Sequence, residues 1–216
     1  NAVSDPGAGD GSRDDSARGG MTVLAALHDL GLAASYSDHV IVLQGGRVVA
    51  AGPTDTTLTP ELIRELAVGS GNLGMVGGQV LDIQAENKDI DLTTLQSIHK
   101  HKTGMLIRAA VRMGAITAGA TPAQLDDLTF YAEQIGLAFQ IADDVLNVTG
   151  TREELGKNPN TDAQRGKKTY PTFYGVEGAK QLAEECVTRA NDRLASFGSK
   201  ADPLRELARY ITSRKN

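Results

Sequence analysis

The chain has 216 residues, a formal net charge of −5 and a pI near 5.4, and 40% of its residues are hydrophobic. These values are ordinary for a soluble globular protein and argue against a nucleic-acid binder, which would be basic. We expect neither a membrane span nor a signal peptide, because no apolar run is long enough and the first twenty residues are polar and rich in glycine. The single cysteine, Cys186, excludes an internal disulfide, so we expect a cytoplasmic protein.

Residues 1–20 are rich in glycine, serine and aspartate and contain almost nothing to bury, so they are predicted to be a disordered tail. The sequence starts with Asn1 instead of methionine, and we expect the natural chain to begin further upstream. Residues 21–63 predict a small α/β unit. TVLAAL (22–27) is typical of a buried strand, a short helix follows, and residues 40–52 predict a β-hairpin around the turn QGG.

Residues 64–216 are predicted to be a helical domain, because the signals for β structure vanish beyond Pro60. Residues 61–86 have helical spacing and many glycines, which we expect to allow close approach of helices. Further helices are predicted over 92–119 with Asp91 as N-cap, from Pro122 to Gly150, and near 176–197 and 202–214. The fold class is therefore mainly all-α, a helical bundle preceded by a small α/β segment.

The helix that starts at Pro122 carries two adjacent aspartates, Asp143 and Asp144, in the stretch FQIADDVLNVTG (139–150). They lie on a narrow polar stripe between apolar flanks, near the helix C-terminus, where the helix dipole is unfavourable to anions. Asp126 and Asp127 lie near the N-terminus of the same helix, where the dipole stabilises them, and need no special role.

The aspartate pair has two interpretations. Carboxylates at 143 and 144 converge with the side-chain oxygen of Asn147, and Mg²⁺ prefers such oxygen ligands together with phosphate oxygens. The alternative is a pair that points at bulk water or bridges to lysines of another helix. Nearby segments are basic, although each lysine alone is typical of a solvated surface: Lys100, Lys102, Lys157, Arg165, Lys167 and Lys168. Carboxylates flanked by basic loops favour diphosphate binding.

Four motifs in order resemble the C-terminal half of trans-isoprenyl diphosphate synthases, over about residues 62–216. They are GMVGGQVLDI (74–83), HKHKTGMLIRAAVRMGA (99–115), GLAFQIADDVLNVTGTREELGK (136–157) and DAQRGKKTYPTFYG (162–175). The bacterial farnesyl and geranylgeranyl diphosphate synthases are the members most similar to them. The resemblance implies an all-α fold with a central cavity, a homodimer, and condensation of an allylic diphosphate with isopentenyl diphosphate.

The same resemblance implies roles for particular residues. Asp143, Asp144 and Asn147 correspond to the second aspartate-rich motif, which binds Mg²⁺, with Asn147 standing where the family has aspartate. The diphosphate-binding residues are implied to be Lys102, Lys157 and Lys167, and the residues that stabilise the developing cation Lys102, Thr103 and Gln140. The family's first aspartate-rich motif and the basic motif for isopentenyl diphosphate are absent from this sequence, so we expect an incomplete active site in this chain.

Residues 21–63 resemble the C-terminal end of an ATP-binding cassette ATPase of the haem or iron–siderophore import type. The resemblance implies that His28, in ALHDL, is the switch histidine that senses the γ-phosphate. The phosphate-binding loop of such ATPases is absent, so we expect His28 to be a structural or exposed residue in this chain. A fusion or assembly junction is expected near residues 61–66.

Three hypotheses follow. The first is a prenyltransferase that makes a short prenyl diphosphate with Mg²⁺. The second is a non-catalytic subunit that binds metal and diphosphate beside a complete synthase. The third, which depends on His28 alone, is the remnant of a transporter ATP-binding subunit.

Overall fold

The computed structural model describes residues 37–44, 47–150, 162 and 166–214. The described chain begins with two antiparallel strands, β1 (His39–Gln44) and β2 (Arg47–Pro53), with His39 opposite Pro53. The register shifts once, between Val42 and Leu43. The predicted hairpin is therefore confirmed. The predicted strand at 22–27 and His28 lie outside the described residues.

A short helix, α2 (Thr54–Thr57), leads into α3 (Pro60–Ser70), which is followed by α4 (Met75–Ala85). The spacing of apolar residues over 61–86 predicted helix throughout, but the structure has a break at residues 71–74. A Cβ atom at Gly74 would lie 2.2 Å from the carbonyl oxygen of Gly69, so this turn requires glycine.

Helix α5 (Leu92–His99) continues through a π-helical turn (Lys100–Gly104) into α6 (Met105–Thr117). The Asp91 side chain accepts a hydrogen bond from the Thr94 N–H, which confirms the predicted N-cap. Helix α7 (Pro122–Thr149) begins with a capping box between Thr121 and Gln124. One long helix was predicted over 92–119, and the π-helical turn inside it was not.

The last helices are α10 (Tyr170–Arg193) and α11 (Asp202–Ser213), joined by a 3₁₀ segment (Ala195–Ala201). Helix α10 begins earlier than the predicted 176 and has a break at Gly175, whose φ of +69° is one that glycine adopts without strain. Of residues 150–168, which connect α7 to α10, the structure describes only 150, 162 and 166–168.

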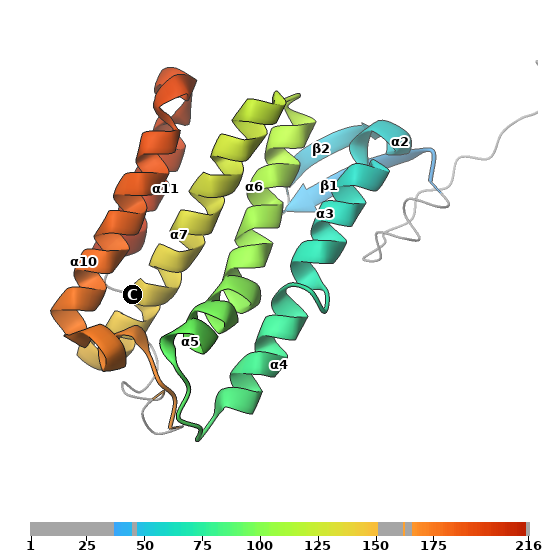
Figure 1. Ribbon diagram of the computed structural model, residues 1–216. Helices are drawn as coiled ribbons and strands as arrows, with labels where there is room; N and C mark the ends of the chain where they lie inside the picture. Colours follow the sequence, from blue (N-terminus) through green and yellow to red (C-terminus); the bar gives the residue numbers. More distant parts are fainter. Residues whose placement is uncertain (1–36, 45–46, 151–161, 163–165, 215–216) are drawn as a thin grey trace, which may run out of the picture.

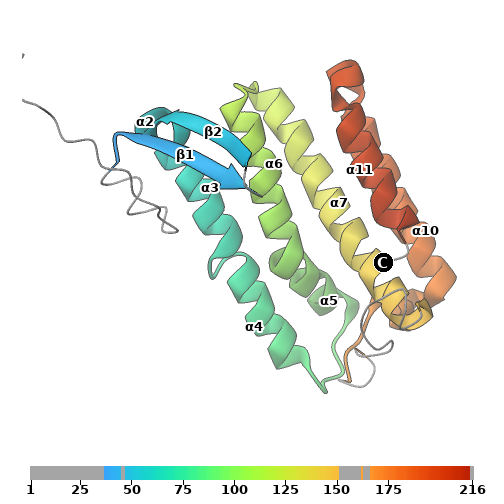
Figure 2. The same cartoon turned by 180° about the vertical axis from the view of Figure 1, so that it is seen from behind.

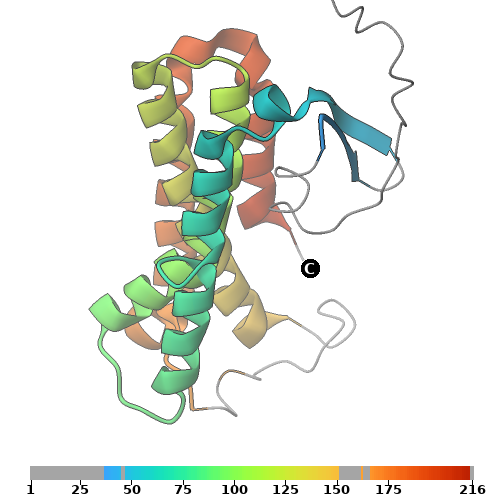
Figure 3. The same ribbon diagram turned by 90° about the vertical axis from the view of Figure 1, so that its right-hand side faces the viewer.

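The helices lie side by side in a row that runs from α3 and α4 through α5 and α6 to α7 and α10, with α11 packed beside α10 and α7 (Figure 1). The hairpin stands to one side of this row (Figure 3). The core lies mainly between α7, α10 and α11, and its fully buried side chains include Tyr131, Ile141, Cys186 and Leu194. The fold is mainly all-α, as predicted. None of the described helices is long and apolar enough to cross a membrane.

A charged seam fixes three helices of the row to one another. Arg112 of α6 donates to both carboxylate oxygens of Glu65 on α3, at 2.9 and 2.7 Å, and to the Thr129 hydroxyl on α7 at 2.8 Å. The hydrogen bond from Arg112 holds the pKa of Glu65 below its ordinary value, although burial opposes this. At the opposite ends of these helices from the seam, α4, α5, the C-terminus of α7 and the start of α10 come together (Figure 2).

Candidate functional site

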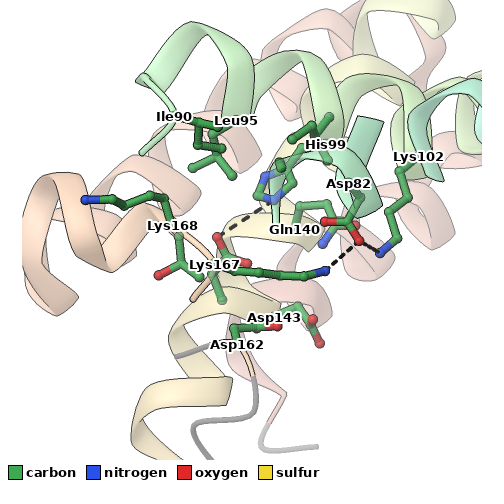
Figure 4. Close-up of a pocket in the computed structure, with 14 residues that line it drawn as sticks. Asp82, Ile90, Leu95, His99, Lys102, Gln140, Asp143, Asp162, Lys167 and Lys168 are labelled. Atoms are coloured by element: carbon green, nitrogen blue, oxygen red, sulfur yellow. Dashed lines mark hydrogen bonds and ion pairs between the residues drawn. The ribbon is translucent and has the colours of Figure 1, made fainter. Parts of the chain in front are cut away.

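A cavity lies where the ends of α4, α5 and α7 meet the start of α10, and about 70 Å³ of it is open to water. Ile90, Leu95 and Ile98 form its apolar wall. Its charged side chains come from four separate segments: Asp82, Lys102, Asp143, Asp144, Asp162, Lys167 and Lys168. Four carboxyl groups and three ammonium groups therefore share one small space (Figure 4).

Asp82 pairs with two of the predicted diphosphate-binding lysines. Its Oδ2 accepts from the Lys102 ammonium at 2.8 Å and from the Lys167 ammonium at 2.7 Å. The side chains of Asp82 and Lys167 are each 13% exposed, and Glu86 adds a second carboxylate 3.6 Å from Lys167. Burial raises the pKa of Asp82, but the hydrogen bonds from the two lysines outweigh it, so the net shift is downward. Asp82 is thus ionised at neutral pH.

Close packing of α4 against the π-helical turn brings Asp82 to Lys102. A Cβ atom at Gly78 would lie 2.0 Å from the Lys102 backbone nitrogen, so only glycine fits there. On the opposite side of the turn, a Cβ atom at Gly136 of α7 would lie 3.0 Å from the Gly104 Cα. Asp82 follows Gly78 by one helical turn on the same face, and it therefore reaches the Lys102 side chain. The expected close approach of helices at the glycines is confirmed.

Two of the residues predicted to stabilise a cation are in contact. The Thr103 hydroxyl, on the π-helical turn, donates a hydrogen bond to Gln140 Oε1 on α7. Gln140 lines the cavity beside Lys102. A hydroxyl that donates its hydrogen retains its lone pairs, so Thr103 still presents electron density. The structure brings Gln140 to the adjacent pair Lys102 and Thr103, with Thr103 lying 37 residues earlier in the sequence, although the catalytic role of the three residues stays a prediction.

Asp143 and Asp144 lie in different environments. Asp143 is partly exposed and lines the cavity, whereas Asp144 is 5% exposed. Asp144 Oδ2 accepts a hydrogen bond from the Tyr170 backbone N–H at 2.9 Å, at the first turn of α10. Burial raises the pKa of Asp144 to about 8, with a further contribution from Asp162 and Asp143, and the Tyr170 hydrogen bond only partly opposes it.

His99 is a buried neighbour of this carboxyl group. Its Nε2 lies 3.9 Å from Asp144 Oδ2, and its ring stacks on Tyr170 with centroids 5.5 Å apart. The pKa of His99 is lowered to about 4, mainly by burial; the negative charge of Asp82 opposes this and the positive charges of Lys102 and Lys167 add to it, so the ring is neutral at pH 7. Because Asp144 is also mostly protonated at that pH, the pair is a polar contact and not an ion pair.

The remaining predicted site residues lie in different places. Asn147 is 2% exposed and its Oδ1 accepts from the Asp162 N–H at 3.4 Å, so this oxygen holds the segment that leads to Lys167. Its role as a metal ligand stays a prediction. Lys157 falls outside the described residues. Among the side chains that the structure describes, no group of three or more histidine, cysteine, aspartate or glutamate residues is placed to hold a metal ion.

Sequence reasoning missed Asp82, His99 and Asp162 as members of the site. Asp82 had a usable signal, because a carboxylate one helical turn after a glycine pair lies on the face at which the neighbouring chain approaches. His99 had only its position four residues before Thr103. Asp162 is brought in by a contact to Asn147 across a loop, and nothing local in the sequence indicates it.

The fold and the cavity are those of an α-helical protein that gathers lysines and carboxylates at one end of its helices. The family model described as Polyprenyl synthetase matches residues 58–199. The chain belongs to the polyprenyl synthetase family. A farnesyl diphosphate synthase of Escherichia coli is 46% identical over 157 residues, which cover 71% of this chain and 52% of that protein. The chain thus spans about half the length of the curated relatives it matches.

Solved structures are similar in the same way. A farnesyl/geranylfarnesyl diphosphate synthase from Zymomonas mobilis has a TM-score of 0.60 and 40% identity, covering 70% of this chain and 50% of that one. A geranyltransferase from Helicobacter pylori, solved with magnesium and isoprenyl diphosphate, has a TM-score of 0.59 and 32% identity, covering 71% of this chain and 50% of that one. These similarities support the assignment to the family.

The contact at Gly78 leads to a prediction about stability. We expect Gly78→Ala to lower the free energy of unfolding by about 2 kcal/mol, because the new methyl group collides with backbone that cannot move away cheaply. Gly114→Ala in α6 is the matched control. No atom lies within 4 Å of the Cβ it adds, so better helix propensity should stabilise it by about 0.5–1 kcal/mol. Urea unfolding followed by circular dichroism measures both, and equal effects of the two changes would contradict the packing described.

The raised pKa of Asp144 predicts how stability depends on pH. The folded state holds this proton up to a pKa of about 8, whereas an unfolded aspartate loses it near pH 4. The stabilisation is therefore complete below about pH 4 and is lost as the pH rises through about 8. In metal-free buffer, the wild type should lose more stability than Asp144→Asn between pH 6 and pH 9. Asp126→Asn, at the other end of α7, should follow the wild type, and parallel pH profiles for all three proteins would refute the prediction.

Proposed function

We propose that the chain carries the metal- and diphosphate-binding half of a prenyltransferase that condenses an allylic diphosphate with isopentenyl diphosphate. The observation that carries the proposal is the cavity in which Lys102, Lys167, Asp143 and Asp144 lie together. Membership of the polyprenyl synthetase family and the similarity to a farnesyl diphosphate synthase support it. The expected product is a short-chain prenyl diphosphate.

The roles of the side chains follow from their charges. Lys102, Lys167 and Lys157 bind the allylic diphosphate and offset the negative charge that grows on it as the allylic C–O bond breaks. The oxygens of Thr103 and Gln140 face the positive charge that develops on the allylic carbon. The alkene of isopentenyl diphosphate then supplies the electron pair of the new C–C bond, and loss of a proton restores a neutral hydrocarbon chain.

Mg²⁺ is the cofactor in this proposal, and the similar geranyltransferase from Helicobacter pylori was solved with magnesium bound. Asp143, Asp144 and Asn147 would hold the ion in this chain, and it would neutralise charge on the leaving diphosphate. The donor set fits: a partly exposed carboxylate and a neighbouring buried one suit a cation that takes one or two carboxylates and completes its shell with phosphate oxygens. Ionisation of Asp144 accompanies binding of the metal.

The organisation of the chain remains part of the proposal. It comprises a tail over 1–20, a fragment over 21–63 that resembles an ATP-binding cassette ATPase, and a synthase-like helical domain over 64–216. The fragment's resemblance rests on the sequence alone, and the nucleotide-sensing role of His28 stays a prediction. A cytoplasmic location also belongs here, expected from the single cysteine.

We also infer a homodimer, which the family resemblance implies. Helix α4 presents an exposed apolar stripe with Val76 at 49%, Val80 at 48% and Ile83 at 58% exposure. Spacings of three and four residues are typical of a face that packs against another helix. We expect the wild type to sediment as a dimer and Val80→Lys as a monomer. Val148→Lys, at an exposed valine of α7, is the matched control and should stay dimeric, and a wild-type monomer would contradict the inference.

The enzymatic prediction concerns the whole 216-residue chain. If the half of the site that this chain carries suffices for catalysis, incubation with Mg²⁺, labelled isopentenyl diphosphate and dimethylallyl or geranyl diphosphate yields longer prenyl diphosphates, detected by chromatography. Asp144→Ala should slow product formation by about 100-fold, since it removes a metal ligand. Asp126→Ala removes a carboxylate from the N-terminal part of the same helix and should leave the rate unchanged.

Other outcomes would redirect the assignment. If no product forms, and yet Mg²⁺-dependent diphosphate binding is lost in Asp144→Ala, the chain is a binding subunit and not an enzyme. If it binds ATP, and this binding survives Asp144→Ala but is lost in His28→Ala, it is a nucleotide-binding module.

A further inference from the structure

Two ammonium groups in the cavity are held by a single carboxylate oxygen. Lys102, from the π-helical turn, and Lys167, from the segment before α10, both lie within 3 Å of Asp82 Oδ2 (Figure 4). Two like charges this close repel one another strongly in a partly buried site unless an anion lies between them. The anion in this structure is Asp82. A phosphate group that binds both lysines would have to take the same place.

The other charged groups of the cavity make it unfavourable for a phosphate group alone to replace Asp82. The side chain of Lys167 is 13% exposed and that of Lys102 is 36% exposed, so neither pair is fully screened by water. Three further carboxyl groups line the same cavity, those of Asp143, Asp144 and Asp162. A lone anion that enters must compete with Asp82 for the lysines and approach these carboxyl groups as well. A divalent cation that enters with the anion removes the second cost, because it is attracted to the same carboxylates.

We propose that Asp82 is a positioning and selectivity residue, which clamps Lys102 and Lys167 together and withholds them from anions that arrive without a divalent cation. This inference rests on the proposed diphosphate-binding function and deepens it. We call Asp82, Lys102 and Lys167 the lysine clamp. The clamp keeps the two ammonium groups at the separation that one shared oxygen dictates, and that geometry suits adjacent oxygens of a diphosphate. Free phosphate or diphosphate faces the full competition with Asp82.

Asp82→Asn tests the clamp, because the amide keeps the shape of the side chain and removes the competing charge. Titration calorimetry with inorganic diphosphate, in EDTA and in Mg²⁺, gives the affinity of the full chain in both conditions. In EDTA we expect Asp82→Asn to bind diphosphate about tenfold more tightly than the wild type, because Lys102 loses its carboxylate partner and Lys167 keeps only the longer contact to Glu86, at 3.6 Å. The gain in affinity on adding Mg²⁺ should be correspondingly smaller in the variant.

Asp89→Asn is the matched control for the change in charge. Asp89 pairs with Lys168, another lysine of the cavity, at 2.9 Å, but its side chain is 90% exposed. Because water and salt screen this pair, the control should change diphosphate affinity in EDTA less than about twofold. A purely structural role of Asp82 would weaken binding in both conditions and would not produce tighter binding without metal.

The clamp and the proposed function fail in different ways. If Asp82→Asn binds metal-free diphosphate no more tightly than the wild type, or neither protein binds it, the clamp is wrong. If the wild type fails to bind diphosphate in Mg²⁺, the proposed function is wrong, and the comparison in EDTA still decides the clamp.

A second measurement avoids any defect in folding, because it uses the wild type. Carboxyl ¹³C NMR follows the pKa of Asp82, which lies below its ordinary value while both lysines bind it. Saturation with Mg²⁺ and diphosphate should raise this pKa as the lysines turn to the ligand. If the pKa of Asp82 stays the same on saturation, the proposal that diphosphate replaces Asp82 as the partner of the two lysines is wrong.

Discussion

The positions of the charged groups in the cavity depend on one backbone contact, that of Gly78 with the π-helical turn at Lys102. With any side chain at residue 78, α4 would have to move away, and Asp82 would no longer reach the Lys102 ammonium. Asp82 in turn holds Lys167, which lies three residues before the start of α10. That turn donates the backbone N–H that fixes Asp144. A contact between two backbone segments of the chain thus sets the positions of both the lysines and the acidic residues.

The same chain of contacts explains why the charges differ in state. Asp82 receives two ammonium groups, which stabilise its ionised form, whereas Asp144 receives one neutral N–H and has carboxyl groups as neighbours. Burial acts on both in the same direction, so the partners decide the outcome. The net result is a cavity in which Asp82 is ionised and paired with two ammonium groups, whereas the buried Asp144 is mostly protonated at neutral pH.

Local signals in the sequence predicted most of the helices. Asp91 caps its helix as expected, α7 begins at Pro122 and ends before Gly150 as expected, and the predicted strands of the hairpin pair, since each depends on residues within a few positions of one another. The π-helical turn packs against glycines of distant segments, Gly78 and Gly136, and the break at 71–74 depends on glycine backbone that meets the carbonyl oxygens of the preceding turn; the periodicity of apolar residues indicates neither contact.

The site residues likewise separate into those that the sequence indicates and those that only the three-dimensional fold brings together. Motif order identified Lys102, Gln140 and the aspartate pair, and the structure brings them to one cavity. Asp82 lies 20 residues from Lys102 and 85 from Lys167, so its double pairing required the three-dimensional fold. The polar stripe of α7 predicted that apolar residues flank Asp144. The first turn of α10, which binds the Asp144 carboxyl group, comes from 26 residues further along the chain and was not predicted.

In the proposed function, the binding of the cation and the binding of the anion are therefore coupled through the protein. Tyr170 occupies Oδ2 of Asp144, which leaves the other oxygen of that carboxylate to act beside Asp143. Since Mg²⁺ completes its coordination with phosphate oxygens, a ligand that brings such oxygens strengthens the metal site. The two lysines need an anion between them, and a ligand that supplies one can displace Asp82. One diphosphate meets both requirements at once, so metal and diphosphate should each raise the affinity for the other, as linkage demands.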